Sequence, residues 1–79
     1  DTAIRQDPAN PSAYNLRGLV YRSMGESENA VQSYSKAIQL TSDNAVFYYN
    51  RSYAYYDLGE TAKQKADEES ACYYQISYC

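Results

Sequence analysis

Few residues in this sequence are of types that carry out chemistry. Histidine is absent, which excludes Ser-His and Cys-His nucleophile pairs and most zinc sites. Asp67, Glu68 and Glu69 are consecutive, but neighbouring residues of a helix point in different directions, so we interpret them as a solvated face and not as a cation site. No acid and base are paired in a way that predicts a pocket. We therefore predict no catalytic residue, no metal site and no cofactor, and a chain that is not an enzyme.

Two further patterns concern covalent modification. Cys72 and Cys79 are seven residues apart, and in a continuous helix their Cα atoms would lie about 10 Å apart, too far for a disulfide. We expect buried or free thiols, with an intermolecular disulfide through Cys79 as the alternative in an oxidising compartment. Asn50, Arg51 and Ser52 form an N-glycosylation sequon, but it falls inside a predicted helix. Glycosylation of Asn50 is therefore the alternative for a secreted chain only.

The composition limits the class of protein further. Seventy-nine residues leave room for one small domain. Seven basic and ten acidic residues give a net charge of −3 and a pI near 4.7, and clustered basic residues for a nucleic acid are missing. The longest apolar run, 45–49, is far shorter than the roughly 18 residues of a membrane-spanning helix. Eleven tyrosines supply much of the apolar surface, so we expect a packed chain. From the charge and the short apolar run we expect no nucleic-acid or membrane partners.

The elements that position these residues are organised as an internal repeat. A shift of 34 residues superimposes 11–44 on 45–78, and it also places residues 3–4 on 37–38, which indicates the end of a preceding copy. Each copy has two stretches of helical periodicity on either side of a glycine, Gly25 or Gly59. Six positions are identical between the copies: Tyr14/Tyr48, Arg17/Arg51, Tyr21/Tyr55, Gly25/Gly59, Glu26/Glu60 and Ala37/Ala71.

Capping residues bound the predicted helices. Asn10 and Pro11 are favoured at the N-cap and at the first helical position, and Gly25 suits the residue that follows a helix. The first helices of the two copies are predicted near 12–24 and 46–58. Thr61 and Gln64 have the capping-box spacing, which predicts that the last helix begins near residue 62.

Large and small side chains alternate along the predicted core faces. We expect the small residues to let the helices approach closely while the tyrosines fill the space between them. In the second copy, Tyr48 and Tyr55 are expected on the core face. In the first copy, the small residues are Gly18, Ala30 and Ala37, and the large ones are Tyr14, Tyr21 and Tyr34.

These residues resemble the tetratricopeptide repeat, whose pattern is W-x2-L-G-x2-Y followed by A-x3-F. Tyr14, Gly18 and Tyr21 occupy the aromatic, glycine and tyrosine positions, and Ala30 and Tyr34 occupy A-x3-F. The resemblance implies an all-α fold of antiparallel helix hairpins stacked as an α-solenoid. Its repeats would span 11–44 and 45–79, after the end of a preceding repeat and a linker at 1–10.

The second copy departs from the pattern in its last helix. Gln64 and Glu68 stand where alanine and an aromatic residue are expected, so we interpret Gln64 as a cap partner of Thr61 and Glu68 as a residue facing water or a polar partner. A helix hairpin of this type needs neighbours, and about three repeats are normally required. We therefore expect either a piece of a longer solenoid or copies that associate through their open ends.

The resemblance also implies a groove, lined by the first helix of each repeat, that holds a peptide or protein segment. In this chain the groove would have an aromatic half and a polar-basic half. The alternative is that the aromatic half packs against an adjacent repeat or a second copy. A carboxylate clamp is a poor match, because Asn50 matches one of its asparagines but the lysines are missing. The predicted groove residues are Asn15, Leu19, Arg22, Tyr49, Asn50, Tyr53 and Tyr56.

The sequence thus predicts a protein–protein interaction module that binds a peptide or protein segment without catalysis. Tyrosine suits this role because its broad ring has few rotors and its hydroxyl is satisfied when half-buried. The alternative is a structural solenoid unit that self-associates end to end into an oligomer or filament. A segment that regulates an attached enzyme is a third, more remote possibility. The compartment is not predicted.

Overall fold

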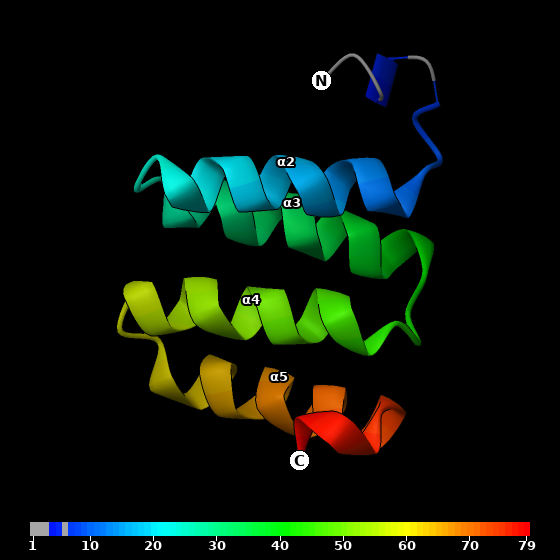
Figure 1. Cartoon of the computed structure of the whole chain (residues 1–79). Coiled ribbons are helices and arrows are strands. Elements are labelled where there is room, and N and C mark those ends of the chain that lie inside the picture. The colour runs from blue at the N-terminus through cyan, green and yellow to red at the C-terminus, as the bar shows by residue number, and fades with distance from the viewer. Residues whose placement is uncertain (1–3, 6) are drawn as a thin grey trace.

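Four helices stacked in chain order make up most of the computed structural model, which describes residues 4–5 and 7–79 (Figure 1). They are α2 (Pro11–Ser23), α3 (Ser27–Leu40), α4 (Ala45–Asp57) and α5 (Thr61–Tyr74), followed by the short 3-10 helix η1 (Ile76–Tyr78). The described residues contain no strand. The predicted all-α fold of antiparallel hairpins is therefore confirmed.

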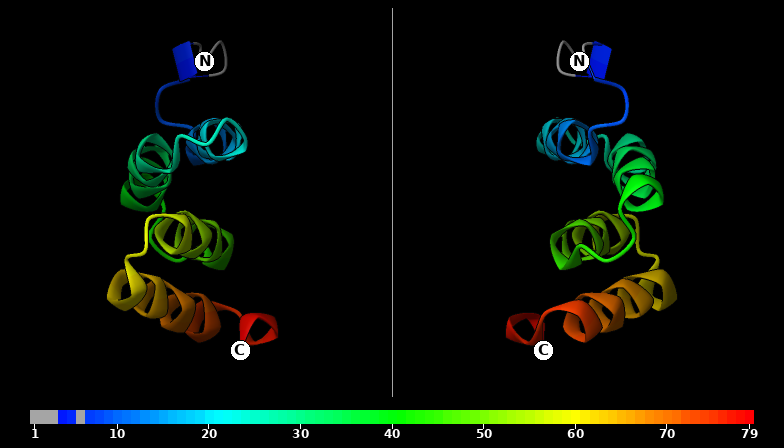
Figure 2. Two further views of the ribbon diagram at one scale, coloured as in Figure 1. Left: turned by 90° about the vertical axis from the view of Figure 1, so that its left-hand side faces the viewer. Right: turned by 90° about the vertical axis from the view of Figure 1, so that its right-hand side faces the viewer.

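The helices form two layers, which are clearest when the stack is viewed along the helix axes (Figure 2). α2 and α4 lie on one side of the stack, and α3 and α5 lie on the other. Consecutive helices pack against each other, and α2 also contacts α4. After α5 the chain turns back, so η1 lies on the side of α2 and α4. We refer to that side as the α2/α4 surface.

The first helices of the two hairpins, α2 and α4, begin and end with the same local structures. The side-chain oxygen of Asn10 accepts a hydrogen bond from the backbone N–H of Ser12, and that of Asn44 accepts one from Val46, both at 3.0 Å. Gly25 has a φ of 80°, a backbone conformation open to glycine, and Gly59 repeats it at 74°. The next residue's N–H then reaches back to the helix, as in a Schellman motif. The predicted caps and glycine turns are confirmed.

The core follows the predicted alternation of large and small residues. An ideal Cβ built on Gly18 would lie 2.5 Å from the Tyr34 ring, so the absence of a side chain at Gly18 lets α2 approach α3. Tyr34 is fully buried, and its hydroxyl has no partner among the described residues. This orphan hydroxyl stands at the phenylalanine position of the repeat pattern. Two clusters form the core: Tyr14, Ala37 and Phe47, joined by Ile4 and Ile38, and Ala30, Tyr34 and Ala54, joined by Tyr21 and Val31.

The prediction that Tyr48 and Tyr55 form the core face of α4 is only partly right. Both are half-buried, while Phe47 and Ala54 are buried against the first hairpin. The reason is that α4 packs between α3 and α5 and so has two covered sides. Tyr48 belongs to the side that faces α5, where its ring stacks on Tyr74 at 5.6 Å between ring centroids.

An arginine lies between two tyrosine rings in each hairpin. The Arg17 guanidinium lies 5.1 Å from the centre of the Tyr14 ring, and its Nε donates to the Ser33 hydroxyl at 3.0 Å. In the second hairpin Arg51 donates twice to Asp67, with both distances 2.7 Å. Burial lowers the pKa of Arg51, but the hydrogen bond and charge of Asp67 outweigh it and raise that pKa.

The prediction that Asp67 belongs to a solvated face is therefore wrong, because Asp67 is only 3% exposed. Its neighbours Glu68 and Glu69 are exposed, as predicted. The position of Asp67 follows from the repeat, since it corresponds to the buried Ser33 of the first hairpin. A longer acidic side chain at that position reaches the equivalent arginine and neutralises its charge.

The capping-box prediction for the last helix is wrong. The helix begins at Thr61, its N-cap is Glu60, and no side chain caps it. Because Glu60 is the N-cap, Thr61 is the first helical residue and Gln64 the fourth, so the pair is displaced by one position from the capping-box spacing. The Gln64 side chain instead donates to Glu68 at 3.3 Å.

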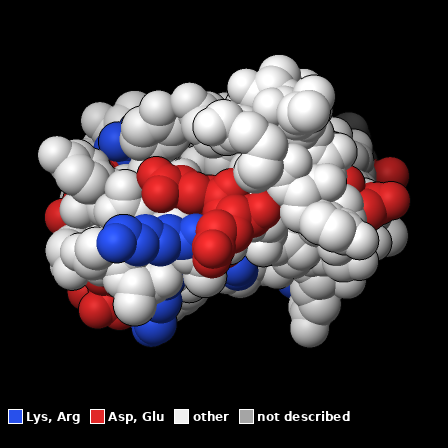
Figure 3. Space-filling model, turned by 90° about the horizontal axis from the view of Figure 1, so that it is seen from below, with Lys and Arg blue, Asp and Glu red and all other residues white. Residues whose placement is uncertain are grey.

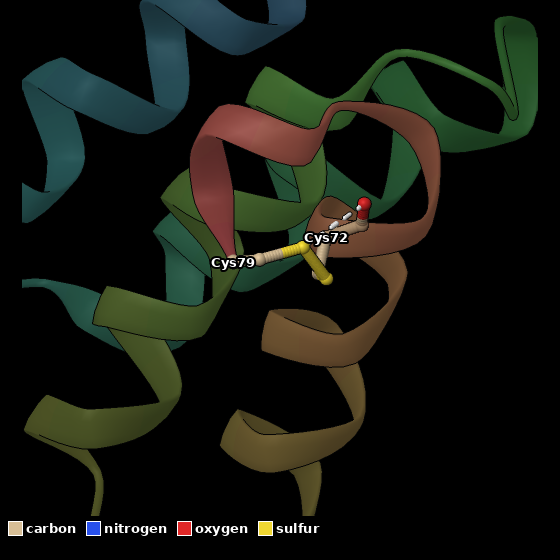
Figure 4. The surroundings of a disulfide bond; sticks show 2 residues. All are labelled: Cys72 and Cys79. Atoms are coloured by element: carbon tan, nitrogen blue, oxygen red, sulfur yellow. Dashed lines mark hydrogen bonds between the residues drawn. A yellow bond between two sulfur atoms is a disulfide. The ribbon is translucent and has the colours of Figure 1, made fainter.

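The prediction of free or buried thiols is also wrong. Cys72 and Cys79 form a disulfide with a Cα–Cα distance of 4.6 Å (Figure 4). The expected separation assumed a continuous helix, but α5 ends at Tyr74, and Gln75 has extended backbone angles. The chain then folds back through η1, which brings Cys79 beside the last turn of α5.

The repeat boundaries at 10/11 and 44/45 remain predictions. Residues 1–3 and 6 lie outside the described part of the chain, so the expected helix end there is described only at Ile4 and Arg5, both helical. Ile4 packs against the first core cluster, which also contains Tyr14 and Phe47.

Candidate functional site

The predicted groove residues come from the two helices of the α2/α4 surface. Asn15, Leu19 and Arg22 lie on α2, and the other four lie on α4. Leu19 is 44% exposed and Tyr56 is 65% exposed. Five of the seven, namely Asn15, Arg22, Tyr49, Asn50 and Tyr53, form hydrogen bonds or ring contacts within the chain. The binding role of all seven stays a prediction.

Two asparagines join the helices near the middle of this surface. The Asn50 side-chain nitrogen donates to the Asn15 side-chain oxygen at 2.9 Å, and both residues are half-buried. Because this nitrogen is the atom that glycosylation would modify, the position of Asn50 within α4 argues against a used sequon in the folded chain. The same bond occupies the amide that a carboxylate clamp would need.

A second polar bridge joins the ends of the same helices. Arg22 donates to both carboxylate oxygens of Asp57, at 2.7 and 3.2 Å, and Ser27 donates to Asp57 at 3.0 Å. The hydrogen bond from Arg22, more than that from Ser27, lowers the pKa of Asp57, against the opposing effect of burial. The hydrogen bond that Arg22 donates to Asp57 likewise raises the pKa of Arg22. The positive charge of Arg22 is therefore already paired with the carboxylate of Asp57 within the chain.

Tyrosines form the aromatic part of the surface. The Tyr49 and Tyr53 hydroxyls lie 2.8 Å apart, and their rings meet edge to face with centroids 5.0 Å apart. This hydrogen bond raises the pKa of Tyr49. The Arg22 guanidinium lies 5.2 Å from the centre of the Tyr53 ring. Tyr56, the third tyrosine of the predicted stripe, points to solvent and has no aromatic contact among the described residues.

Sequence reasoning missed the contribution of the C-terminal turn. The Tyr78 ring lies 4.4 Å from that of Tyr49, measured between centroids, so η1 extends the aromatic part of the α2/α4 surface. The missed signal was the repeat itself. Residue 75 corresponds to residue 41, where α3 has just ended, so a helix end at Tyr74 was predictable.

The described residues offer no other chemistry. No group of three or more cysteine and acidic side chains in this part of the chain is arranged to hold a metal ion. None of the described helices has the length and apolar character needed to cross a membrane. The remaining feature of interest is a hollow beside η1, lined by Tyr49, Tyr78, Lys65, Glu68, Glu69 and the disulfide.

Comparisons with known proteins agree with the stacked hairpins. A family model described as TPR repeat matches residues 18–59, and one described as Tetratricopeptide repeat matches residues 1–32. A search of curated proteins finds no match. Repeats of this kind generally mediate protein–protein interaction and are typically non-catalytic scaffold modules. The chain belongs to the tetratricopeptide repeat family.

Proposed function

We propose that the chain binds an extended segment of another protein along the α2/α4 surface and catalyses no reaction. The observation that carries the proposal is a row of exposed apolar and aromatic side chains on that surface. Leu19, Tyr53 and Tyr56 are 44, 43 and 65% exposed, and they come from both helices. Contiguous exposed apolar side chains of this kind are typical of interaction sites.

The polar residues of the surface have a supporting role in this proposal. The Asn15–Asn50 bond and the Arg22–Asp57 pair each join α2 to α4, so the exposed side chains project from two helices held at a fixed spacing. A preorganised surface loses less conformational freedom when a partner binds. The partner would therefore bind mainly through apolar contacts with Leu19, Tyr53 and Tyr56.

Selection of displayed peptides on the immobilised chain tests the proposal. Peptides that are selected would be labelled, and their Kd measured by fluorescence anisotropy for the natural chain and for Tyr53→Ala. Truncation of a central interface tyrosine costs about 2 kcal/mol or more, roughly a 30-fold rise in Kd. Helicity measured by circular dichroism should remain near that of the natural chain.

Tyr73→Ala is the matched control. Tyr73 is 82% exposed on α5, so the variant removes the same side chain from a different helix, and the Kd should not change. Equal effects of the two substitutions, or no selected peptide that senses Tyr53→Ala, would refute the proposed surface. Loss of helicity in Tyr53→Ala would show instead that Tyr53 has a packing role.

A second candidate function is end-to-end self-association, and exposed residues at the α5 end favour it. Tyr73 and Ile76 are 82 and 87% exposed there, where a further repeat or a second copy would pack. Light scattering over a range of chain concentrations separates the two functions. A size that grows with concentration, and that Ile76→Ser abolishes, supports self-association, whereas a constant monomer contradicts it.

A further inference from the structure

A hollow of about 580 Å³ lies where the C-terminal turn meets α4 and α5. Its volume is within the range of pockets that hold small ligands or single side chains, roughly 300–1,000 Å³. It opens next to Tyr49, and thus at the η1 end of the α2/α4 surface. None of its residues except Tyr49 belongs to the predicted groove. Its lining residues are Tyr49, Lys65, Glu68, Glu69, Tyr78 and the bonded Cys72 and Cys79.

The disulfide shapes this hollow by fixing the turn that forms one wall. η1 has three residues and none of them is buried, so it has little packing of its own. The bond from Cys79 to Cys72 ties its end to α5 (Figure 4). Tyr78 is thereby placed against Tyr49, with ring centroids 4.4 Å apart.

The chemistry of the walls favours a positive charge. From the sequence we expected no cation site here, but Glu68 and Glu69 both line this hollow. They supply two carboxylates against the single ammonium of Lys65, which leaves one net negative charge. Neither glutamate forms an ion pair within the described residues. Seen from the α5 end, acidic side chains gather near the middle of the face, beside a basic one (Figure 3). Two tyrosine rings complete the walls, and a cation is attracted to the face of such a ring.

We propose that this hollow receives a lysine or arginine side chain of the bound protein segment. The partner role rests on the proposed function, whereas the preference of the hollow for a cation does not. The aliphatic stem of the side chain would lie against Tyr49 and Tyr78, and its charged end would reach Glu68 and Glu69. A segment bound along the α2/α4 surface would then be apolar over α2 and α4 and basic at the η1 end.

Single-residue probes test the hollow without involving the rest of the surface. The probes are N-acetyl-arginine methylamide, its glutamate analogue, and the norleucine analogue, which keeps an apolar stem without the charge. Binding would be measured from chemical-shift changes of the backbone amides of residues 65–79. We expect the arginine probe to bind at least about tenfold more tightly than the norleucine probe, and the glutamate probe not to bind.

Charge-matched variants locate the site. The double variant Glu68→Gln/Glu69→Gln should weaken arginine binding at least about tenfold. Glu26→Gln/Glu28→Gln removes the same charge from the start of α3 in the first hairpin and should leave arginine binding unchanged. Lys65→Met removes the competing cation and should strengthen it. Cys79→Ser should weaken it, because the wall that carries Tyr78 is released.

Equal binding of the arginine and norleucine probes would overturn the proposal, and so would shifts confined to residues outside 65–79 and Tyr49. Equal effects of the two double-glutamine variants would reduce the result to general charge attraction and would also overturn it. The outcome is independent of peptide selection on the natural chain, which tests the proposed function. Selected peptides that sense Tyr53→Ala but contain no basic residue would refute the hollow's partner role alone.

Discussion

Replacing Gly18 with alanine tests the central packing contact of the fold. The added Cβ would lie 2.5, 2.7 and 2.8 Å from three atoms of the Tyr34 ring. The ring is fully buried between helices, so it cannot make room by turning out into solvent. Either the α2–α3 distance must increase or the ring must leave its preferred rotamer.

Two opposing contributions determine the size of the effect. Overpacking of a buried site costs about 1–3 kcal/mol, and a contact this short with three ring atoms belongs at the upper end. Alanine also favours the helix by about 1 kcal/mol relative to glycine. We expect a net loss of about 1–2 kcal/mol in the free energy of unfolding. Thermal and urea unfolding followed by circular dichroism would show it, with a Tm lower by about 4–8 °C per kcal/mol.

The second repeat supplies the control. Ser52 corresponds to Gly18, and the exposed Glu68 corresponds to Tyr34, so a Cβ at residue 52 meets no buried ring. Ser52→Ala loses the hydrogen bond from the buried Ser52 hydroxyl to the Tyr49 carbonyl, which costs about 1 kcal/mol, and gains part of it back through the helix propensity of alanine, so it should cost less than Gly18→Ala. In a Tyr34→Leu background, which removes the outer ring atoms, Gly18→Ala should cost much less than in the natural chain. If Gly18→Ala raised the Tm of the natural chain, helix propensity alone would account for it, and the close contact would be refuted.

Two electrostatic predictions follow from the ion pairs. Asp67→Ala leaves Arg51 without its acidic partner and should lower the free energy of unfolding by about 3 kcal/mol. Ser33→Ala, at the equivalent position of the first hairpin, should lower it by about 1 kcal/mol. Chemical unfolding of the two variants measures both costs, and equal costs would contradict the pairing. Asp57→Asn should lower the Tm at neutral pH. Because the folded-state pKa of Asp57 is lowered, its contribution is complete above the unfolded-state pKa of about 3.9 and is lost as the pH falls through the folded-state value. The Tm difference should therefore disappear in acid, and a constant difference would contradict the linkage.

The fold was predictable because its signals recur. Asn10 and Asn44 cap the starts of α2 and α4 in the same way, and Gly25 and Gly59 follow the ends of the same two helices with nearly equal φ. Each local preference is weak alone, but its recurrence after 34 residues makes coincidence improbable. Alternation of small and large residues then identified Gly18 as a close-approach site.

The prediction for the two cysteines was wrong because the repeat was not applied to the end of the chain. Thr41 and Gln75 are 34 residues apart and have similar extended backbone angles, with φ of −144° and −150°. A helix end after Leu40 therefore implied one after Tyr74, and with it a return that allows the Cys72–Cys79 disulfide. The ion pair of Asp67 has a different origin, because the burial of the equivalent Ser33 is seen only in the folded chain.

The partners of the surface residues were harder to predict, because they depend on the register between α2 and α4. Both polar bridges join residues 35 positions apart, Asn15 to Asn50 and Arg22 to Asp57. This separation is one residue more than the repeat, and only the packing of the helices determines it. Once the register is known, the polar residues that looked available for recognition are seen to be used within the chain. Under the proposed function, the exposed apolar side chains of the same surface would be the ones that select a partner.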